Sequence, residues 1–95
     1  MRQPLYEDDD LSVFFAIDEE TDEAFVELES SPDGPDLSLE DDVIVAVGGE
    51  ISSVSSDSPR EATAPLGKWG DLEKEGLELM IRVGEWFESW ELELG

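Results

Sequence analysis

The apolar residues of this chain come in short runs between acids and turn-forming residues, and this spacing constrains the fold more than any other feature. Leu11–Ile17 (LSVFFAI) is rich in β-branched and aromatic residues and has acids on both sides. Val43–Val47 (VIVAV) follows three acids and precedes Gly48 and Gly49. Short runs with such flanks are typical of buried β-strands. The sequence therefore predicts a mainly β fold.

Further strands are predicted next to these two runs. In AFVELE, Phe25 and Glu27 alternate with Val26 and Leu28, so this segment is expected to pair with the first run as a hairpin. The segment 30–36, SSPDGPD, has the turn chemistry of a loop. The glycine pair at 48–49 supplies positive φ for a tight turn into a short strand over 50–54.

Two segments are expected to lie outside the sheet. Residues 1–10 end in the acid run Glu7–Asp10 and are interpreted as a solvated acidic arm, with the folded domain at 11–95. The serine-rich segment 52–58 is interpreted as a linker into a short helix, because Ser58 suits the N-cap and Pro59 the first helical position. Pro65 lies inside that helix or ends it.

The last third of the chain has two interpretations. One long amphipathic helix would gather its apolar residues on one side, namely Leu72, Leu79, Met80, Val83, Trp86, Phe87, Trp90 and Leu94. The alternative is a hairpin of two strands that turns at Gly84 and Glu85. Its first strand would have Leu77, Leu79, Ile81 and Val83 on one face, and its second Trp86, Trp90, Leu92 and Leu94 on one face. Periodicity alone slightly favours the helix, but Gly76 and Gly84 would each cost it about 1 kcal/mol.

Composition excludes several classes of function. The 95 residues include no cysteine and no histidine, so no disulfide framework, thiolate nucleophile, imidazole base or Cys/His zinc site is expected. Carboxylate runs such as Glu7–Asp10 lack the ligand spacing of a calcium loop. We therefore expect no catalytic residues, no metal and no cofactor. No signal peptide or membrane span is expected, which implies a cytoplasmic location if the chain is complete and otherwise leaves localisation open.

The charge is the second strong feature: 27 acidic residues stand against 5 basic ones, giving a net charge of −22. One explanation is a high-salt environment, because at about 1 M salt the Debye length is only ~3 Å and self-repulsion largely disappears. The other is an acidic mimic or inhibitor, of the immunity or anti-defence type, that blocks a basic site on a partner. The even spread of acids along the chain favours the first. Direct nucleic-acid binding is not expected.

The order of these pieces resembles the PDZ domain family. The stretch LSLEDDVIVAVGGEISSV is similar to the centre of that family's pattern, with matches at Leu39, Asp42, Val43, Ile44, Val47, Gly49 and Ile51. SPREATAPLGKWGD is similar to the family's groove helix, and GLELMIRVGEWFESWELELG to its closing hairpin. The resemblance implies a partly open barrel or sandwich of five to six strands with one or two short helices. It also implies the hairpin reading of the C-terminal third.

The resemblance further implies a non-catalytic module that binds a peptide or protein segment by β-strand addition. The peptide would lie between the first strand and the groove helix. The binding residues implied on the strand are Leu11, Ser12, Val13, Phe14, Phe15, Ala16 and Ile17. Those implied on the helix are Pro59, Ala62, Thr63 and Leu66, for which plain core is an equal alternative. Domains of this kind also occur as regulatory parts of proteases, so a parent protease is a further implied partner.

The sequence departs from the family where a ligand's terminal carboxylate would bind. The family's glycine-rich loop corresponds here to Asp10–Phe14, in which the glycines are missing and Asp10 adds a negative charge. Two like charges 4 Å apart repel by about 1 kcal/mol in water and ~4 kcal/mol at an effective dielectric of 20. Binding of an internal segment is therefore favoured over capture of a free C-terminus. The three tryptophans are interpreted as core and rim.

Overall fold

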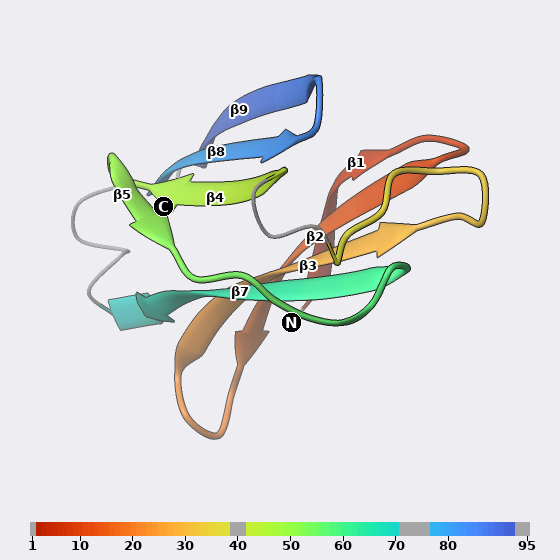
Figure 1. Cartoon of the computed structure of the whole chain (residues 1–95). Helices are drawn as coiled ribbons and strands as arrows, with labels where there is room; N and C mark the ends of the chain where they lie inside the picture. Colours follow the sequence, from red (N-terminus) through yellow and green to blue (C-terminus); the bar gives the residue numbers. More distant parts are fainter. Residues whose placement is uncertain (1, 39–41, 71–76, 93–95) are drawn as a thin grey trace.

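The computed structural model of the chain describes residues 2–38, 42–70 and 77–92, which form nine β-strands in two antiparallel sheets (Figure 1). In chain order the strands are β1 (Arg2–Glu7), β2 (Leu11–Asp18), β3 (Glu23–Ser30), β4 (Val43–Val47), β5 (Glu50–Ser52), β6 (Ser55–Ser58), β7 (Glu61–Lys68), β8 (Leu77–Val83) and β9 (Trp86–Leu92). Helix is limited, within these ranges, to Trp69 and Gly70. The mainly β prediction is confirmed, with nine strands instead of five or six.

The two sheets form a small sandwich. Sheet A has the strand order β1-β2-β3-β7-β6 and sheet B the order β5-β4-β8-β9. On one side the chain joins the sheets directly, because β5 and β6 are separated only by Ser53 and Val54. On the other side, the rings of Tyr6 in β1 and Trp86 in β9 lie 4.9 Å apart. The chain itself therefore links the edge strands β5 and β6, and an aromatic contact links the edge strands β1 and β9.

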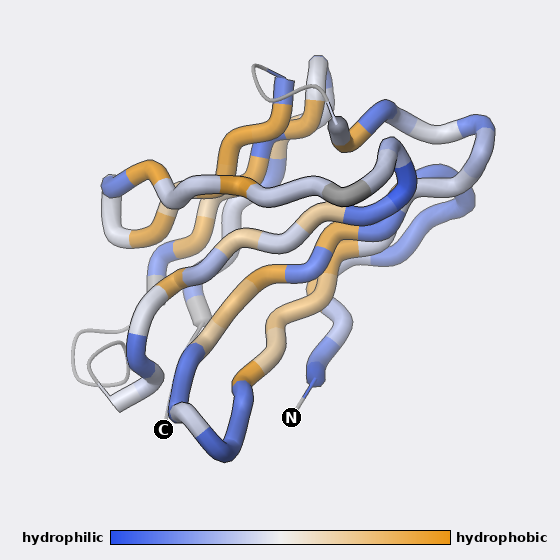
Figure 2. Tube along the Cα trace, turned by 60° about the horizontal axis from the view of Figure 1, so that its bottom comes forward, coloured by the Kyte–Doolittle hydropathy of each residue, from blue (hydrophilic) through white to orange (hydrophobic). Residues whose placement is uncertain are grey.

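The core lies between the sheets and follows the two-residue period of the strands. Each long strand alternates a buried side chain with a more exposed one; the buried set is Leu11, Val13 and Phe15 of β2, Ala24, Val26 and Leu28 of β3, Val43 and Val45 of β4, Ala62, Ala64 and Leu66 of β7, and Leu79, Ile81 and Val83 of β8. Leu37 joins them from a loop. Full burial of an aliphatic side chain contributes about 1.5–3 kcal/mol, so this cluster is the main stabilising feature. Hydrophilic residues gather in the turns (Figure 2).

The stretch around Val43–Val47 has an architectural role, as predicted. The strand is central in its sheet because it pairs with β5 on one side and β8 on the other. Gly48 and Gly49 have φ angles of 59° and 86°, which L side chains rarely adopt, and they turn the chain into β5. The backbone oxygen of Asp42 accepts a hydrogen bond of 2.7 Å from Gly84 N, which ties the start of β4 to the β8–β9 turn.

The N-terminal segment is not the solvated arm that the sequence predicted. Arg2–Glu7 pairs with β2 in antiparallel register and forms an edge of sheet A. The segment is polar and carries a proline, so it lacks the apolar alternation that identifies a strand from sequence. Arg2 holds it in place by reaching across β2 toward β3, which has no signature in the local sequence.

The helix predicted after Ser58 is wrong. Residues 61–68 form β7, and the serine-rich segment interpreted as a linker contains β6. The burial pattern of β7 alternates strictly, with Ala62, Ala64 and Leu66 inside. Alanine favours helices by propensity, but here the strand places small side chains at the centre of the core, and tertiary packing overrides propensity. Pro65 is tolerated because β6 pairs with β7 only at 61–63.

The C-terminal hairpin is confirmed and the long helix is excluded. β8 and β9 pair in unbroken antiparallel register from Leu77↔Leu92 to Val83↔Trp86, with the turn at Gly84 and Glu85. The predictions at Leu39, Leu72 and Leu94 lie outside the described residues. No helix in the described part of the chain is long and apolar enough to cross a membrane.

Candidate functional site

The strand predicted to receive a peptide has no free edge. β2 pairs with β3 from Leu11 to Asp18 and with β1 from Ser12 to Ala16, so the backbone on both of its sides is already engaged in the sheet. Three of the predicted residues, Leu11, Val13 and Phe15, are core residues, and Ile17 packs against the core. The remaining three, Ser12, Phe14 and Ala16, point to the outer face of sheet A by strand alternation. Strand addition at β2 is therefore excluded by the position of β1.

The four residues predicted for the helix side of the groove do not lie together either. Ala62 and Leu66 are buried in the core, while Pro59 lies in the turn before β7. Thr63 faces outward, but Glu27 of β3 stands between it and Phe14 in the register of the sheet. A groove between β2 and a helix at 59–66 does not exist in this fold, because β3 lies between those two segments.

The loop before β2, which was compared above with the carboxylate-binding loop of PDZ domains, holds a carboxylate of its own. Asp8 Oδ1 accepts hydrogen bonds of 2.7 Å from the backbone N–H groups of both Asp10 and Leu11. The backbone oxygen of Asp10 in turn accepts a bond of 3.0 Å from Ser31 N. A free C-terminus would have to displace the Asp8 side chain from these donors.

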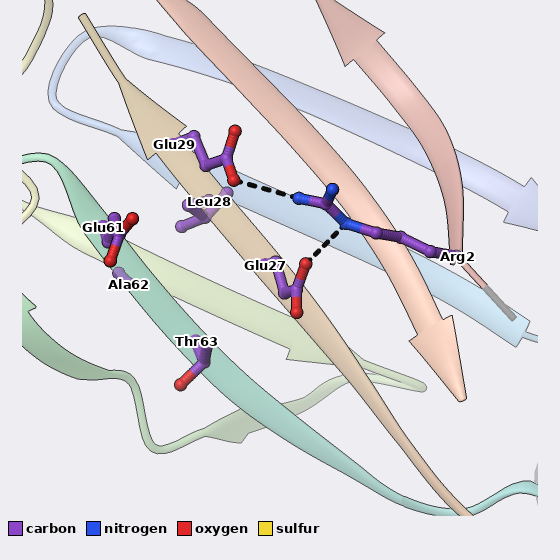
Figure 3. Close-up of a pocket in the computed structure, with 7 residues that line it drawn as sticks. All are labelled: Arg2, Glu27, Leu28, Glu29, Glu61, Ala62 and Thr63. Atoms are coloured by element: carbon purple, nitrogen blue, oxygen red, sulfur yellow. Dashed lines mark hydrogen bonds and ion pairs between the residues drawn. The ribbon is translucent and has the colours of Figure 1, made fainter. Parts of the chain in front are cut away.

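A shallow hollow of about 370 Å³ lies on the outer face of sheet A (Figure 3). Arg2 spans it: Nε lies 2.7 Å from Glu27 Oε2 and Nη2 lies 2.9 Å from Glu29 Oε1. The guanidinium also sits 3.8 Å from the centroid of the Phe14 ring, a cation–π contact. Because both glutamates already have a cation, this hollow is best explained as the clamp that fastens β1 to β3.

The described residues offer no cluster of metal ligands. No group of three or more carboxylates among them is arranged to hold a metal ion. Two of the acids instead make hydrogen bonds within their own turns. Asp8 accepts from the backbone at the turn before β2, and Asp36 accepts from the backbone N–H and the hydroxyl of Ser38. These contacts stabilise turns and leave recognition to the strand edges and the sheet faces.

The four sheet edges differ in how they are protected. An exposed edge strand presents unpaired backbone groups, and proteins usually block such edges with short strands, prolines, charges or bulges. β1 carries Pro4 and a register shift between Pro4 and Tyr6. β6 has 4 residues and a register shift, and β5 has only 3 residues. Three edges are therefore poor templates for an added strand.

β9 is the fourth edge and has none of the proline, bulge or short-length devices. It has 7 residues and a continuous register with β8, and it lies on the outside of sheet B (Figure 1). Within the described ranges it pairs with no strand other than β8. Among the residues that the structure describes, only the charges of Glu88 and Glu91 protect this edge. The free edge of β9 is therefore our candidate functional site.

The register indicates which backbone groups of β9 are available. Gly48 N donates to Glu78 O, so Glu78 directs its carbonyl toward β4 and away from β9. Hydrogen bonding alternates along an antiparallel pair, and the pair beside a two-residue turn is hydrogen-bonded. The residues opposite Glu78, Met80 and Arg82 therefore direct their N–H and C=O groups to the free edge. These are Glu91, Ser89 and Phe87.

Aromatic side chains line the inner side of this edge. Trp86 and Trp90 pack against the core with ring centroids 6.3 Å apart, and Trp86 contacts Tyr6 of β1. The interpretation of these tryptophans as core and rim is confirmed, and Trp69 packs on Phe15 in the same way. Aromatic packing therefore supports the inner side of the β9 edge.

Tyr6 and Asp8 form a hydrogen-bonded pair next to Trp86. The Tyr6 hydroxyl donates to Asp8 Oδ2 and lowers the pKa of the Asp8 carboxyl below its ordinary value of 3.8; the N–H groups of Leu11 and Asp10 lower it further. The same bond raises the pKa of the Tyr6 hydroxyl above its ordinary value of 10.0. At neutral pH the pair is held as a neutral phenol and a carboxylate.

The chain matches no protein-family model, no curated protein and no solved structure. Its function is therefore inferred from the geometry of its own residues. The residues that sequence reasoning missed at the site are Phe87, Ser89 and Glu91 of β9. A signal for them was present, because β9 follows the last predicted turn and contains neither proline nor lysine, both common edge blockers.

Proposed function

We propose that the chain is a non-catalytic binding module that takes up an extended segment of a partner protein as an extra strand beside β9. The single observation that supports this is the contrast between the edges: β9 has 7 residues in unbroken register, whereas the others are short, bulged or carry proline. Backbone hydrogen bonds from Phe87, Ser89 and Glu91 would supply affinity. The binding mode is the one implied by the resemblance to PDZ domains, moved from β2 to β9.

The surroundings of β9 define the chemistry of the partner segment. One face of an added strand would lie beside Trp86 and Trp90, and the other beside the exposed ring of Phe87. Glu88 and Glu91 attract cations, and the molecule as a whole carries a net charge of −22. The favoured ligand is therefore an extended segment with β-branched or aromatic residues and at least one lysine or arginine.

A peptide library tests the proposal with a backbone substitution. Ser89→Pro removes an N–H that faces the free edge and leaves the ladder to β8 intact, so the domain should still fold. Ser89→Ala is the matched control, because it changes the side chain and keeps the N–H. We expect peptides selected on the unmodified chain to bind Ser89→Ala with unchanged affinity and to bind Ser89→Pro at least tenfold more weakly. Equal binding to both variants would place the site elsewhere.

Two further conditions separate the competing modes of binding. Peptides with free and with amidated C-termini should bind equally, because the donors of the carboxylate loop are already engaged by Asp8. Molar salt should leave apolar strand addition largely intact. An acidic mimic would instead lose its basic partner steeply as salt rises and would be insensitive to Ser89→Pro. A library that yields no ligand at either salt concentration would contradict the proposal.

A further inference from the structure

The outer face of sheet B carries an apolar stripe on an otherwise acidic molecule. Strand alternation directs Ile44 and Ala46 of β4, Ile51 of β5, Met80 of β8 and Phe87 of β9 to this face, and we call these five residues the outer stripe. The register aligns Ile51, Ala46 and Met80 in one row across the strands, and Ile44 and Phe87 in the row next to it.

The exposure of these side chains is unusual for this protein. Ile51 is 75% exposed, Phe87 56% and Met80 41%, and these are the large hydrophobic residues found exposed in the described part of the chain. All three belong to the same sheet face. Scattered exposed apolar residues are ordinary on a protein surface, but their concentration on one face marks an interaction surface.

A shallow hollow adjoins one end of the outer stripe. It has a volume of about 360 Å³ and lies between β4, β5 and the connection to β6. Its lining is mixed, with apolar side chains and serines: Val43, Ile44, Ile51, Ser52, Ser53 and Val54. The stripe therefore has relief that a complementary apolar surface can fill.

The charged side chains on the same face have no ion-pair partners within the described ranges. Glu78 and Glu91 stand directly opposite each other on β8 and β9, an arrangement that destabilises a sheet. Arg82 lies on the same face four residues along β8, and its Nε donates 3.1 Å to Gly84 O. Within the described ranges, no cation lies within ion-pair distance of Glu78 or Glu91, and no carboxylate within that distance of Arg82.

These charges become complementary when the face meets a copy of itself. Consider a twofold axis that crosses β8 at Met80, perpendicular to the strand and in the plane of contact. The rotation reverses the direction of β8, so Arg82 of each copy faces Glu78 of the other, beside Glu91. It also places the row of Ile51, Ala46 and Met80 of one copy over the same row of the other, while Phe87 of each copy lies over Glu91 of the other. An isologous contact requires this kind of self-complementarity.

We propose that two copies of this chain associate through the outer faces of sheet B, with their rows of Ile51, Ala46 and Met80 in apolar contact and Arg82 of each copy paired with Glu78 of the other. Face-to-face packing of sheets at ~10 Å is an ordinary arrangement. The free edge of β9 stays accessible in this dimer, so the inference is independent of the proposed function.

The net charge of −22 makes this association dependent on salt. Two such molecules repel each other at low ionic strength, whereas the face of contact is nearly balanced. At about 1 M NaCl the Debye length falls from ~8 Å at physiological strength to ~3 Å, which screens the distant acids more than the close pairs. Salt should therefore promote the dimer.

Sedimentation velocity of the full chain at about 0.15 M and about 1 M NaCl tests the proposal. We expect a dimer at the higher salt, and at least a tenfold rise in its dissociation constant for Ile51→Ser and for Arg82→Glu. Lys68→Glu is the matched control, because it makes the same change in charge at an exposed residue of sheet A and should leave the dimer intact. The double variant Glu78→Arg with Arg82→Glu should restore the dimer.

Each result decides the question. Loss of the dimer in Arg82→Glu with recovery in the double variant supports the proposed pairing. A monomer at both salt concentrations would overturn the proposal, as would a dimer that Ile51→Ser leaves unchanged. Equal weakening by Lys68→Glu and Arg82→Glu would assign the effect to net charge and would also overturn it. Ser89→Pro should not change the dimer.

Discussion

At Gly34, two loops approach so closely that a side chain has no room. A Cβ atom at this position would lie 2.2 Å from the backbone oxygen of Asp10 and 2.7 Å from Ser30 Oγ. The first of these atoms is backbone that also accepts from Ser31 N, so it cannot move freely. We expect Gly34→Ala to lower the free energy of unfolding by about 1–3 kcal/mol, which denaturant titration would measure. Gly70→Ala is the control, because its Cβ would lie 3.6 Å from the nearest atom, an ordinary contact.

The Tyr6–Asp8 bond leads to a second prediction at the scale of single residues. Tyr6→Phe keeps the ring beside Trp86 and removes the hydroxyl, the main cause of the low pKa of Asp8. In this variant the pKa of Asp8 should rise but stay below 3.8, because Leu11 and Asp10 still donate. Carboxyl NMR titration would measure it. Asp36, whose pKa is lowered by Ser38, provides an internal control and should not change.

The same bond contributes to stability in a defined range of pH. The pKa of Asp8 is lower in the folded state, so its stabilisation is fully present above the unfolded value, near 3.8, and is lost as pH falls through the folded value. The pKa of Tyr6 is raised, so its part is present below the unfolded value, near 10.0, and is lost as pH rises through the folded value. The stability difference between the native chain and Tyr6→Phe should therefore be largest between these limits. A difference that grows below pH 3.8 would contradict this assignment.

At the scale of elements, Arg2 fastens the start of β1 to the outer face of sheet A. Arg2 bridges Glu27 and Glu29 across β2 and stacks on Phe14. We expect Arg2→Ala to reduce the hydrogen-exchange protection of the β1 amides and to leave β8 and β9 unchanged. Arg2→Lys should be intermediate, because an ammonium group cannot make the two-pronged contact. Lys68→Ala removes a cation from a looser pair of 3.6 Å and should have no such effect on β1.

Six of the nine strands could be predicted from the sequence because their apolar residues follow recognisable patterns. β2 and β4 are short apolar runs, β3 alternates, β5 follows the glycine turn at 48–49, and the β8–β9 hairpin has its turn at Gly84 and Glu85. The other three lack such patterns. β1 and β6 are polar edge strands, and β7 places alanines where most strands place larger residues. For these segments, pairing partners far away in the chain decide the conformation, and local propensity does not.

The candidate site was harder to predict than the fold for a related reason. Whether a strand is central or at an edge depends on the order of strands in the sheet, which is a property of the whole chain. The sequence identified Leu11–Ile17 as a strand and predicted its pairing with β3, but could not show that β1 would occupy its other side. Strand alternation already separated Trp86 and Trp90 from Phe87 on β9, but the pairing with β8 was needed to show that the tryptophan side faces the core.

At the scale of the whole molecule, charge and core oppose each other. A net charge of −22 on 95 residues destabilises the compact state by self-repulsion. Against it stands a core of mostly aliphatic side chains drawn from both sheets. Screening by salt weakens the first contribution and leaves the second in place. The stability of the folded chain should therefore rise with ionic strength.

Thermal unfolding measures this directly, provided that self-association does not interfere. A dimer raises the apparent Tm by mass action, so the measurement is best made on Ile51→Ser, whose exposed substitution lies outside the core. Between about 0.05 M and 1 M NaCl we expect Tm to rise, and each 1 kcal/mol gained corresponds to about 4–8 °C for a domain of this size. Most of the rise should occur at the lower concentrations, where the Debye length changes fastest. A Tm that is unchanged or falls with salt would mean that repulsion among the acids does not limit stability, and that the acidity serves binding instead.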